Sequence, residues 1–224
     1  MTTSDSGLPP GKRGIAGTID GDLEPCWLCG RSVAARALFC HACGAVLPPR
    51  ALDPFTRLGL ERRFDLDLEQ VGRQFAGFSR ALDPERFAAR GARQQANARA
   101  QADALEEAFE TLRDPVRRAR ALLALMDVSP LPPPETPDEE VADLAEQLAA
   151  AAAAEDAVAV DRLGNAVTQR IEACIKYLAP ALRNAQADPA RSEGALRILA
   201  RLEQLEALAQ EARDRRAALA PRGP

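Results

Sequence analysis

The sequence predicts a mostly α-helical chain that begins with a small cysteine-rich module. Aromatic residues make up only 4% of its 224 residues, and alanine, leucine and arginine dominate the second half. Those three residue types lose little conformational entropy in a helix. Apolar residues also recur at helical spacing after residue 50, and no strand pattern appears outside the cysteine-rich part. We therefore expect packed helices in place of an extended sheet.

The first helical region, residues 51–127, is divided by Asp-Pro pairs into four expected helices. Asp53-Pro54 and Asp114-Pro115 each combine an N-cap with proline at the first helical position. Asp83-Pro84 ends the second helix, because the residue before a proline is forced out of the α region. One stripe of the second helix is apolar: Leu68, Val71, Phe75, Phe78 and Leu82. The expected helices cover residues 53–59, 67–83, 90–112 and 115–125.

The remaining segments consist of two tails, a linker and a second helical region. Residues 1–22 are polar and without periodicity, which predicts a disordered tail. Residues 128–137 are rich in proline and predict a semi-rigid linker. Residues 138–218 predict an antiparallel three-helix bundle, since long helical segments are joined by short connections, and 219–224 form a short tail. The expected bundle helices cover about 138–153, 155–185 and 190–217, and Cys174 is expected in their core.

The module at residues 23–50 carries two Cys-x-x-Cys pairs, each followed by glycine. The four cysteines are Cys26, Cys29, Cys40 and Cys43. Each pair supplies two thiolates at the spacing that tetrahedral Zn²⁺ requires, so we expect a zinc ribbon with a closed, structural metal site. A thioredoxin-like redox pair would need a βαβ setting, and two disulfides would need an oxidising compartment; neither is indicated. His41, between two ligands, is interpreted as an exposed turn residue.

Charge and hydropathy exclude two classes of partner. The formal net charge is -4, which gives no cationic field for nucleic acid or anionic lipid. No apolar run approaches the ~20 residues that a membrane-spanning helix needs. The first twenty residues also lack the apolar core of a signal peptide. We expect a soluble, cytoplasmic protein that binds neither nucleic acid nor membrane.

Three segments of the first helical region carry a specific pattern: residues 53–68 read DPFTRLGLERRFDLDL, residues 78–88 read FSRALDPERFA, and residues 108–119 read AFETLRDPVRRA. Together they resemble the J domain of the HscB-type co-chaperones of iron–sulfur cluster assembly. The family pattern runs aromatic-x-x-Leu-Gly-Leu, Phe-Asp-Leu-Asp, then Leu-His-Pro-Asp-Arg-Phe. Some members carry an N-terminal ribbon similar to the CWLCG and FCHACG segments at residues 26–30 and 39–44.

This resemblance implies a ribbon, a four-helix J domain and a C-terminal three-helix bundle. It also implies two partners: a DnaK-type (HscA-type) chaperone, whose ATPase the J domain stimulates, and a cluster scaffold protein, which the bundle delivers to that chaperone. The leading interpretation is an adaptor without an active site of its own, since the sequence shows no nucleophile–base pair, no phosphate loop and no histidine outside the ribbon. The alternative from the residues alone is a zinc-ribbon nucleic-acid or transcription-associated module fused to a helical domain.

The sequence departs from the family at both implied contact sites. At the chaperone contact, His-Pro-Asp is replaced by Asp83-Pro84-Glu85, which turns a hydrogen-bond donor into an acceptor and makes ATPase stimulation doubtful. At the scaffold contact, the residues that match are Val141, Glu146 and Ile198, while Ala142 and Ala145 remove apolar surface. The competing interpretation is that Val141, Leu144 and Ile198 line the bundle core.

Overall fold

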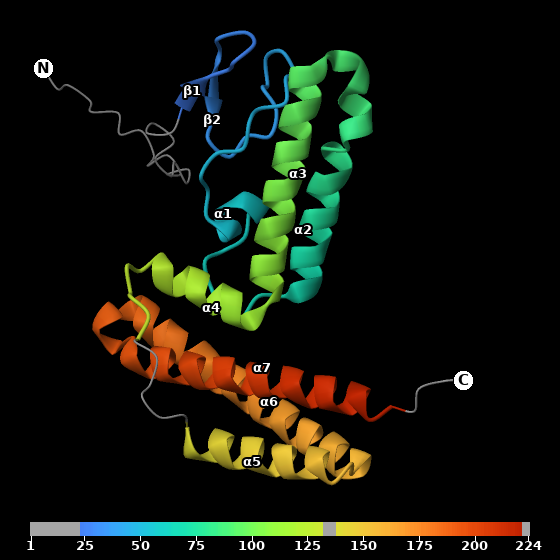
Figure 1. Ribbon diagram of the computed structural model, residues 1–224. Coiled ribbons are helices and arrows are strands. Elements are labelled where there is room, and N and C mark those ends of the chain that lie inside the picture. The colour runs from blue at the N-terminus through green and yellow to red at the C-terminus, as the bar shows by residue number, and fades with distance from the viewer. Residues whose placement is uncertain (1–22, 132–137, 221–224) are drawn as a thin grey trace, which may run out of the picture. The chain divides into compact units, whose positions relative to one another are not determined.

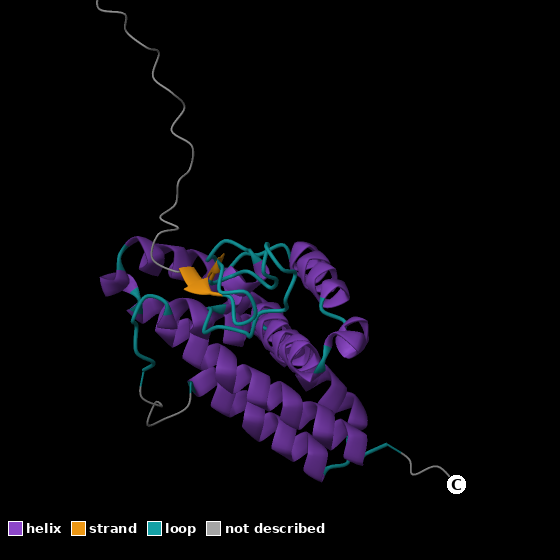
Figure 2. Cartoon of the chain, turned by 90° about the horizontal axis from the view of Figure 1, so that it is seen from above, coloured by secondary structure: helices purple, strands orange, loops and turns teal. Residues whose placement is uncertain are grey.

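The computed structural model describes residues 23–131 and 138–220. The expected disordered tail, most of the proline-rich linker and the last four residues lie outside these ranges. The chain divides into two compact units, Met1–Ala51 with Leu82–Asp103, and Leu52–Ala81 with Ala104–Pro224. We call the first the ribbon unit and the second the helical unit. Within the described residues, strands are confined to the ribbon unit, and helices make up most of the remainder (Figures 1 and 2).

The ribbon unit combines the cysteine module with the start of a long helix. Strands β1 (Leu23–Pro25) and β2 (Ser32–Ala34) pair in antiparallel fashion, with Glu24 opposite Val33. Two further elements complete the unit: the 3-10 helix η1 (Pro84–Arg90) and the first part of α3 (Ala92–Arg113). The ribbon buries a small core of its own, made of Cys26, Val33, Cys40, Ala45 and Leu47.

In the helical unit, aspartates begin the short helices as the sequence predicts. Helices α1 (Pro54–Leu58) and α4 (Pro115–Ala124) start at Asp53 and Asp114, whose side chains accept hydrogen bonds from the N–H groups of Thr56 and Arg117. Gly59 ends α1 with φ 67°, a left-handed conformation that glycine adopts without a Cβ penalty. Between them, α2 (Leu68–Ala81) packs its Phe75 on Phe109 at the end of α3, with ring centroids 4.4 Å apart.

Arg118 of α4 is buried beside the ring of Phe64. Only 6% of Arg118 is exposed, and its guanidinium carbon lies 4.7 Å from the ring centroid. Its Nη1 donates to the carbonyl of Leu112 in the last turn of α3. Burial lowers the pKa of this guanidinium from its ordinary value, opposed by the charge of Asp114. A charged side chain therefore joins α3, α4 and the segment that follows α1.

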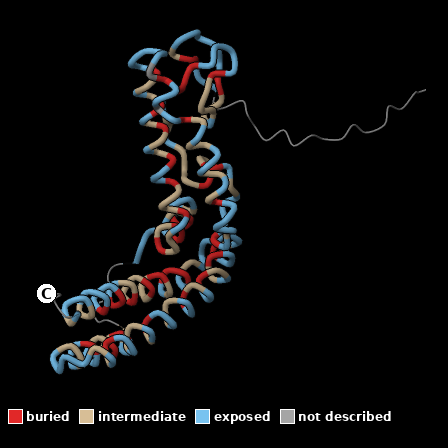
Figure 3. Tube along the Cα trace, turned by 90° about the vertical axis from the view of Figure 1, so that its right-hand side faces the viewer, coloured by how far each residue is buried: buried red, intermediate tan, exposed pale blue. Residues whose placement is uncertain are grey.

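The three long helices of the bundle are α5 (Glu139–Ala153), α6 (Ala157–Ala187) and α7 (Glu193–Ala218). A short 3-10 helix, η2 (Pro189–Arg191), joins the last two. Buried positions recur along the inner sides of these helices (Figure 3). The core includes Leu148, Leu178, Leu182, Leu202 and Leu205, and Cys174 is buried there as expected.

One carboxylate ties the three bundle helices together at the start of α5. Glu140 Oε1 accepts from Arg170 Nε of α6 at 2.6 Å, and its Oε2 pairs with Arg201 of α7. The hydrogen bond from Arg170 and the two positive charges lower the pKa of Glu140. The acidic start of α5 favours the helix dipole, and through Glu140 it also fixes the helix to its neighbours.

The predicted helices all occur, and two details differ. Residues 84–90 form the 3-10 helix η1, which was not expected. This helix forms because Pro84 pre-sets a helical φ and Asp83 caps the turn. Leu68 was assigned to the buried stripe of α2 but is 51% exposed, since it is the first residue of the helix, while Val71 is buried. None of the described helices combines the length and apolar character needed to cross a membrane.

Candidate metal centre and partner contacts

Two turns of the same design place the four cysteines. In the first, the N–H of Gly30 donates to the carbonyl of Cys26 at 2.9 Å, and in the second, the N–H of Gly44 donates to the carbonyl of Cys40 at 2.8 Å. Both glycines have positive φ, 73° and 69°. A residue with a Cβ is strained in that conformation, which explains why a glycine follows each pair.

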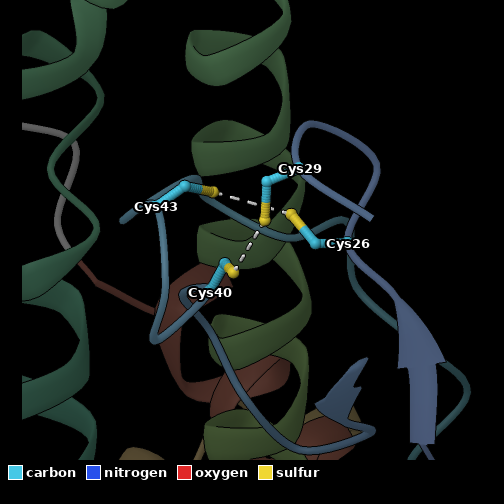
Figure 4. Close-up of side chains that lie close together, drawn as sticks. All are labelled: Cys26, Cys29, Cys40 and Cys43. Carbon is cyan, nitrogen blue, oxygen red and sulfur yellow. Dashed lines mark hydrogen bonds between the residues drawn. The ribbon is translucent and has the colours of Figure 1, made fainter. Parts of the chain in front are cut away.

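The four sulfur atoms converge on one point (Figure 4). Cys26 Sγ lies 3.8 Å from Cys43 Sγ, Cys29 Sγ lies 3.7 Å from Cys40 Sγ, and all four lie within 4.8 Å of one another. A tetrahedral ion with bonds of about 2.3 Å to sulfur places its ligands ~3.8 Å apart. A disulfide would instead need about 2.05 Å. The expected set of metal ligands is thus brought together in the geometry of a metal site.

Local hydrogen bonds favour thiolate character in part of the cluster. The N–H groups of Cys43 and Ala42 lower the pKa of Cys40 to about 6. The pKa of Cys43 is raised to about 12, although the N–H of Ala45 acts to lower it, because desolvation and the neighbouring thiols favour the protonated form. Four sulfurs this close cannot all ionise without a positive charge among them, so the donor set fits a divalent cation. Four thiolates are the ligands of structural zinc sites.

We expect one zinc ion per chain in protein purified without added metal. Substituting Cys40→Ser should remove the ion, since it takes away one of four ligands and a thiolate favoured by its surroundings. Elemental analysis of wild type and variant measures this directly, and Cys174→Ser serves as the matched control because Cys174 lies in the bundle core. Wild-type protein that keeps a folded ribbon without any bound metal would contradict the prediction.

Three amide side chains of α3 bind the end of the ribbon, and the sequence analysis missed them. Gln94 Oε1 accepts from the N–H of Val46 at 2.8 Å, Asn97 Nδ2 donates to the carbonyl of Val46 at 2.9 Å, and Gln101 Nε2 donates to the carbonyl of Leu47 at 3.0 Å. We call Gln94, Asn97 and Gln101 the amide row. Their spacing of three and four residues places them on one helical face, which was the available signal.

The altered triplet lies at the entrance to η1. The side chain of Asp83 accepts a hydrogen bond from the N–H of Glu85 at 3.1 Å and so caps this 3-10 helix. Both residues are exposed, and Pro84 is the first residue of η1. Asp83 therefore has a structural role in the turn, which the sequence analysis did not assign to it.

The three residues expected at the scaffold contact differ in burial. Val141 is 6% exposed and belongs to the bundle core, Ile198 is half-buried, and Glu146 is exposed on α5. Ala142 and Ala145 are half-buried on the same helix. Glu146 and the two alanines are thus accessible to a partner, and Val141 packs inside the bundle.

Two known proteins similar to this chain are named as HscB co-chaperones. No protein-family model matches it. The co-chaperone protein HscB of Proteus mirabilis (strain HI4320) is 34% identical over 77 residues, and the co-chaperone protein HscB homolog of Vibrio cholerae is 35% identical over 74 residues. These alignments cover 34% and 33% of this chain, and the chain spans only 44% and 43% of the two relatives.

Solved structures extend the similarity to most of the chain. The crystal structure of human co-chaperone protein HscB has a TM-score of 0.73 at 20% identity, over 84% of this chain and 96% of the human one. The chaperone HscB from Vibrio cholerae has a TM-score of 0.63 at 25% identity, over 75% of this chain and 99% of its own. The mostly α fold class is confirmed, and a four-cysteine site precedes the helices.

Proposed function

We propose that this chain, an HscB-type protein by its sequence and fold, acts as a co-chaperone-like adaptor in iron–sulfur cluster assembly. One observation carries the proposal: more than seventy residues align at 34–35% identity with proteins named as HscB co-chaperones. The adaptor bridges a DnaK-type chaperone and a cluster scaffold protein, and it works by binding, with no catalytic chemistry of its own. In this proposal the ribbon holds a structural zinc ion, and the protein acts in the cytoplasm.

The chaperone contact is proposed at the Asp83-Pro84-Glu85 turn, and the scaffold contact at the accessible face of α5. Asp83 and Glu85 are exposed, so a partner can reach the turn. On α5, Glu146 offers a charge beside the two small residues Ala142 and Ala145. Since Val141 is buried, the proposed scaffold contact depends on the residues around it and on the half-buried Ile198.

Binding of the purified chain to a cluster scaffold protein, measured by isothermal titration calorimetry, tests the proposed function. We expect a saturable complex with one scaffold per chain. Glu146→Arg should weaken this complex, because it replaces a negative charge at the proposed interface by a positive one, and a reversed charge at an interface opposes association. Glu172→Arg on the exposed part of α6 is the matched control. Wild-type protein that binds no scaffold would overturn the adaptor proposal.

Restoring bulk on α5 should increase affinity for the scaffold. The double change Ala142→Met with Ala145→Leu adds ~50 Å² of apolar area at the contact, which is worth about 1 kcal/mol or roughly a fivefold lower Kd. Ala150→Leu, at an exposed position on a different side of α5, is the control for non-specific adhesion. A lower melting temperature with unchanged affinity would place these two positions in the bundle core instead.

A further inference from the structure

The loop that carries the proposed chaperone contact is closed by a capped backbone turn and holds one buried side chain among those that the structure describes. Asp83 caps its first turn, and the N–H of Arg86 donates to the carbonyl of Asp83 at 3.1 Å. Among the side chains of residues 83–91 that the structure describes, only Phe87 is buried, at 5% exposed. The loop ends at Gly91, whose φ of 93° allows the chain to turn into α3.

The buried anchor of this loop packs on the ribbon. The ring of Phe87 stacks on that of Phe39, with centroids 6.1 Å apart and an angle of 26° between planes. Phe39 directly precedes the ligand Cys40, and its backbone pairs with Val46 in an antiparallel bridge. The position of the Phe39 ring is therefore set by one of the metal-binding turns.

The ribbon also holds the first turns of α3, which directly follow the loop. The indole of Trp27, the residue after Cys26, lies under the guanidinium of Arg93, whose carbon is 4.2 Å from the ring centroid. Trp27 Nε1 donates to the carbonyl of Val46 at 2.8 Å, the same carbonyl that accepts from Asn97 of the amide row. The segment that receives these contacts lies beside the first half of α3 (Figure 1).

We propose that the metal-loaded ribbon is the clamp that orders the η1 loop, residues 83–91. The residues that hold the loop and its exit helix stand next to metal ligands, Phe39 beside Cys40 and Trp27 beside Cys26. Loss of the ion releases those turns, and with them the stacked Phe39 and the backbone of Val46. Metal binding then controls the conformation of the turn at Asp83. The consequence for a chaperone rests on the proposed function; the clamp itself does not.

Amide hydrogen exchange read by mass spectrometry tests the clamp on the full chain, without any partner. Removing the metal with a chelator should speed exchange in peptides that cover residues 83–91 as well as in the ribbon, and should leave α5–α7 unchanged. Phe39→Ala keeps all four cysteines and should retain the ion, while it speeds exchange at 84–90 by roughly two- to tenfold. Leu28→Ala, which alters a side chain that is 56% exposed in the same ribbon, should leave that exchange unchanged.

The outcomes separate the clamp from the adaptor proposal. If Phe39→Ala loses its metal, the milder Phe39→Leu keeps an apolar side chain without a flat ring and is measured in its place. Unchanged exchange at 83–91 after metal removal, or in the metal-loaded Phe39 variant, would overturn the clamp. Neither measurement includes a chaperone or a scaffold protein. A failure of the adaptor proposal therefore leaves the clamp proposal intact.

Discussion

Replacing Arg118 with alanine should lower the free energy of unfolding by about 3 kcal/mol, near the upper end for single substitutions. Three contributions add up in the same direction. The aliphatic stem of a nearly buried side chain is lost beside Phe64, and so is the contact between its cation and the ring. The carbonyl of Leu112 also loses a charged donor at the end of α3, where the helix dipole favours positive charge.

The desolvation penalty of the buried charge opposes the stabilising contacts of Arg118. A second variant separates that penalty from the contacts. Burial lowers the pKa of Arg118, so its charged form is penalised in the folded state. Arg118→Met keeps most of the volume and removes both the charge and its desolvation penalty. If packing dominates, Arg118→Met is close to neutral; if the bond to Leu112 dominates, the variant loses about 1–3 kcal/mol.

Thermal unfolding followed by circular dichroism measures both variants. A loss of about 3 kcal/mol corresponds to a melting temperature lower by roughly 6–12 °C in a chain of this size. Arg120→Ala on the same helix is the matched control: its side chain is 60% exposed and pairs with Glu203, and such surface ion pairs contribute ~0–1 kcal/mol. An effect of Arg118→Ala no larger than that of Arg120→Ala would show that the buried guanidinium is not a structural element.

The sequence predicts the elements that depend on neighbours along the chain. Asp53 and Asp114 begin helices because the N-cap, its proline and the N–H group that donates to its side chain lie within four residues. The cysteine turns are predictable for the same reason: each pair and its glycine form one local unit. Prediction succeeds here because the stabilising partners are adjacent in sequence.

Contacts between distant segments were missed, and the amide row shows why. Gln94 and Gln101 bind backbone atoms 48 and 54 positions away, and backbone atoms leave no trace in the residue types of the ribbon. The burial of Arg118 was not predicted for a related reason: arginine is rarely buried, and this one is buried only through its tertiary neighbours. Val141 fitted a contact by the family resemblance and the core by its helical spacing, and the packing of the bundle places it in the core.

Under the proposed function, Asp83 is the residue on which we expect the stimulation of a chaperone ATPase to depend. In the family that the chain resembles, a histidine at this point presents a donor, whereas Asp83 presents a negative charge and uses its carboxylate to cap η1. If the partner surface is acidic, the carboxylate of Asp83 meets a like charge, and like charges at a close interface are unfavourable by several kcal/mol. We therefore expect the natural protein to stimulate a DnaK-type ATPase weakly or not at all.

The double change Asp83→His with Glu85→Asp should recover part of that stimulation. Single-turnover ATPase assays with wild type and variant measure it, and Asp83→Asn is the matched control, since asparagine also caps helices but carries no charge. If repulsion is the barrier, Asp83→Asn recovers stimulation as well; if the imidazole donor is required, only the histidine variant does. Removing the cap lowers local stability by about 0.5–2 kcal/mol, so the melting temperature of each variant is measured alongside. Strong stimulation by the wild type would contradict the prediction and show that the Asp-Pro-Glu turn is a functional variant of the family motif.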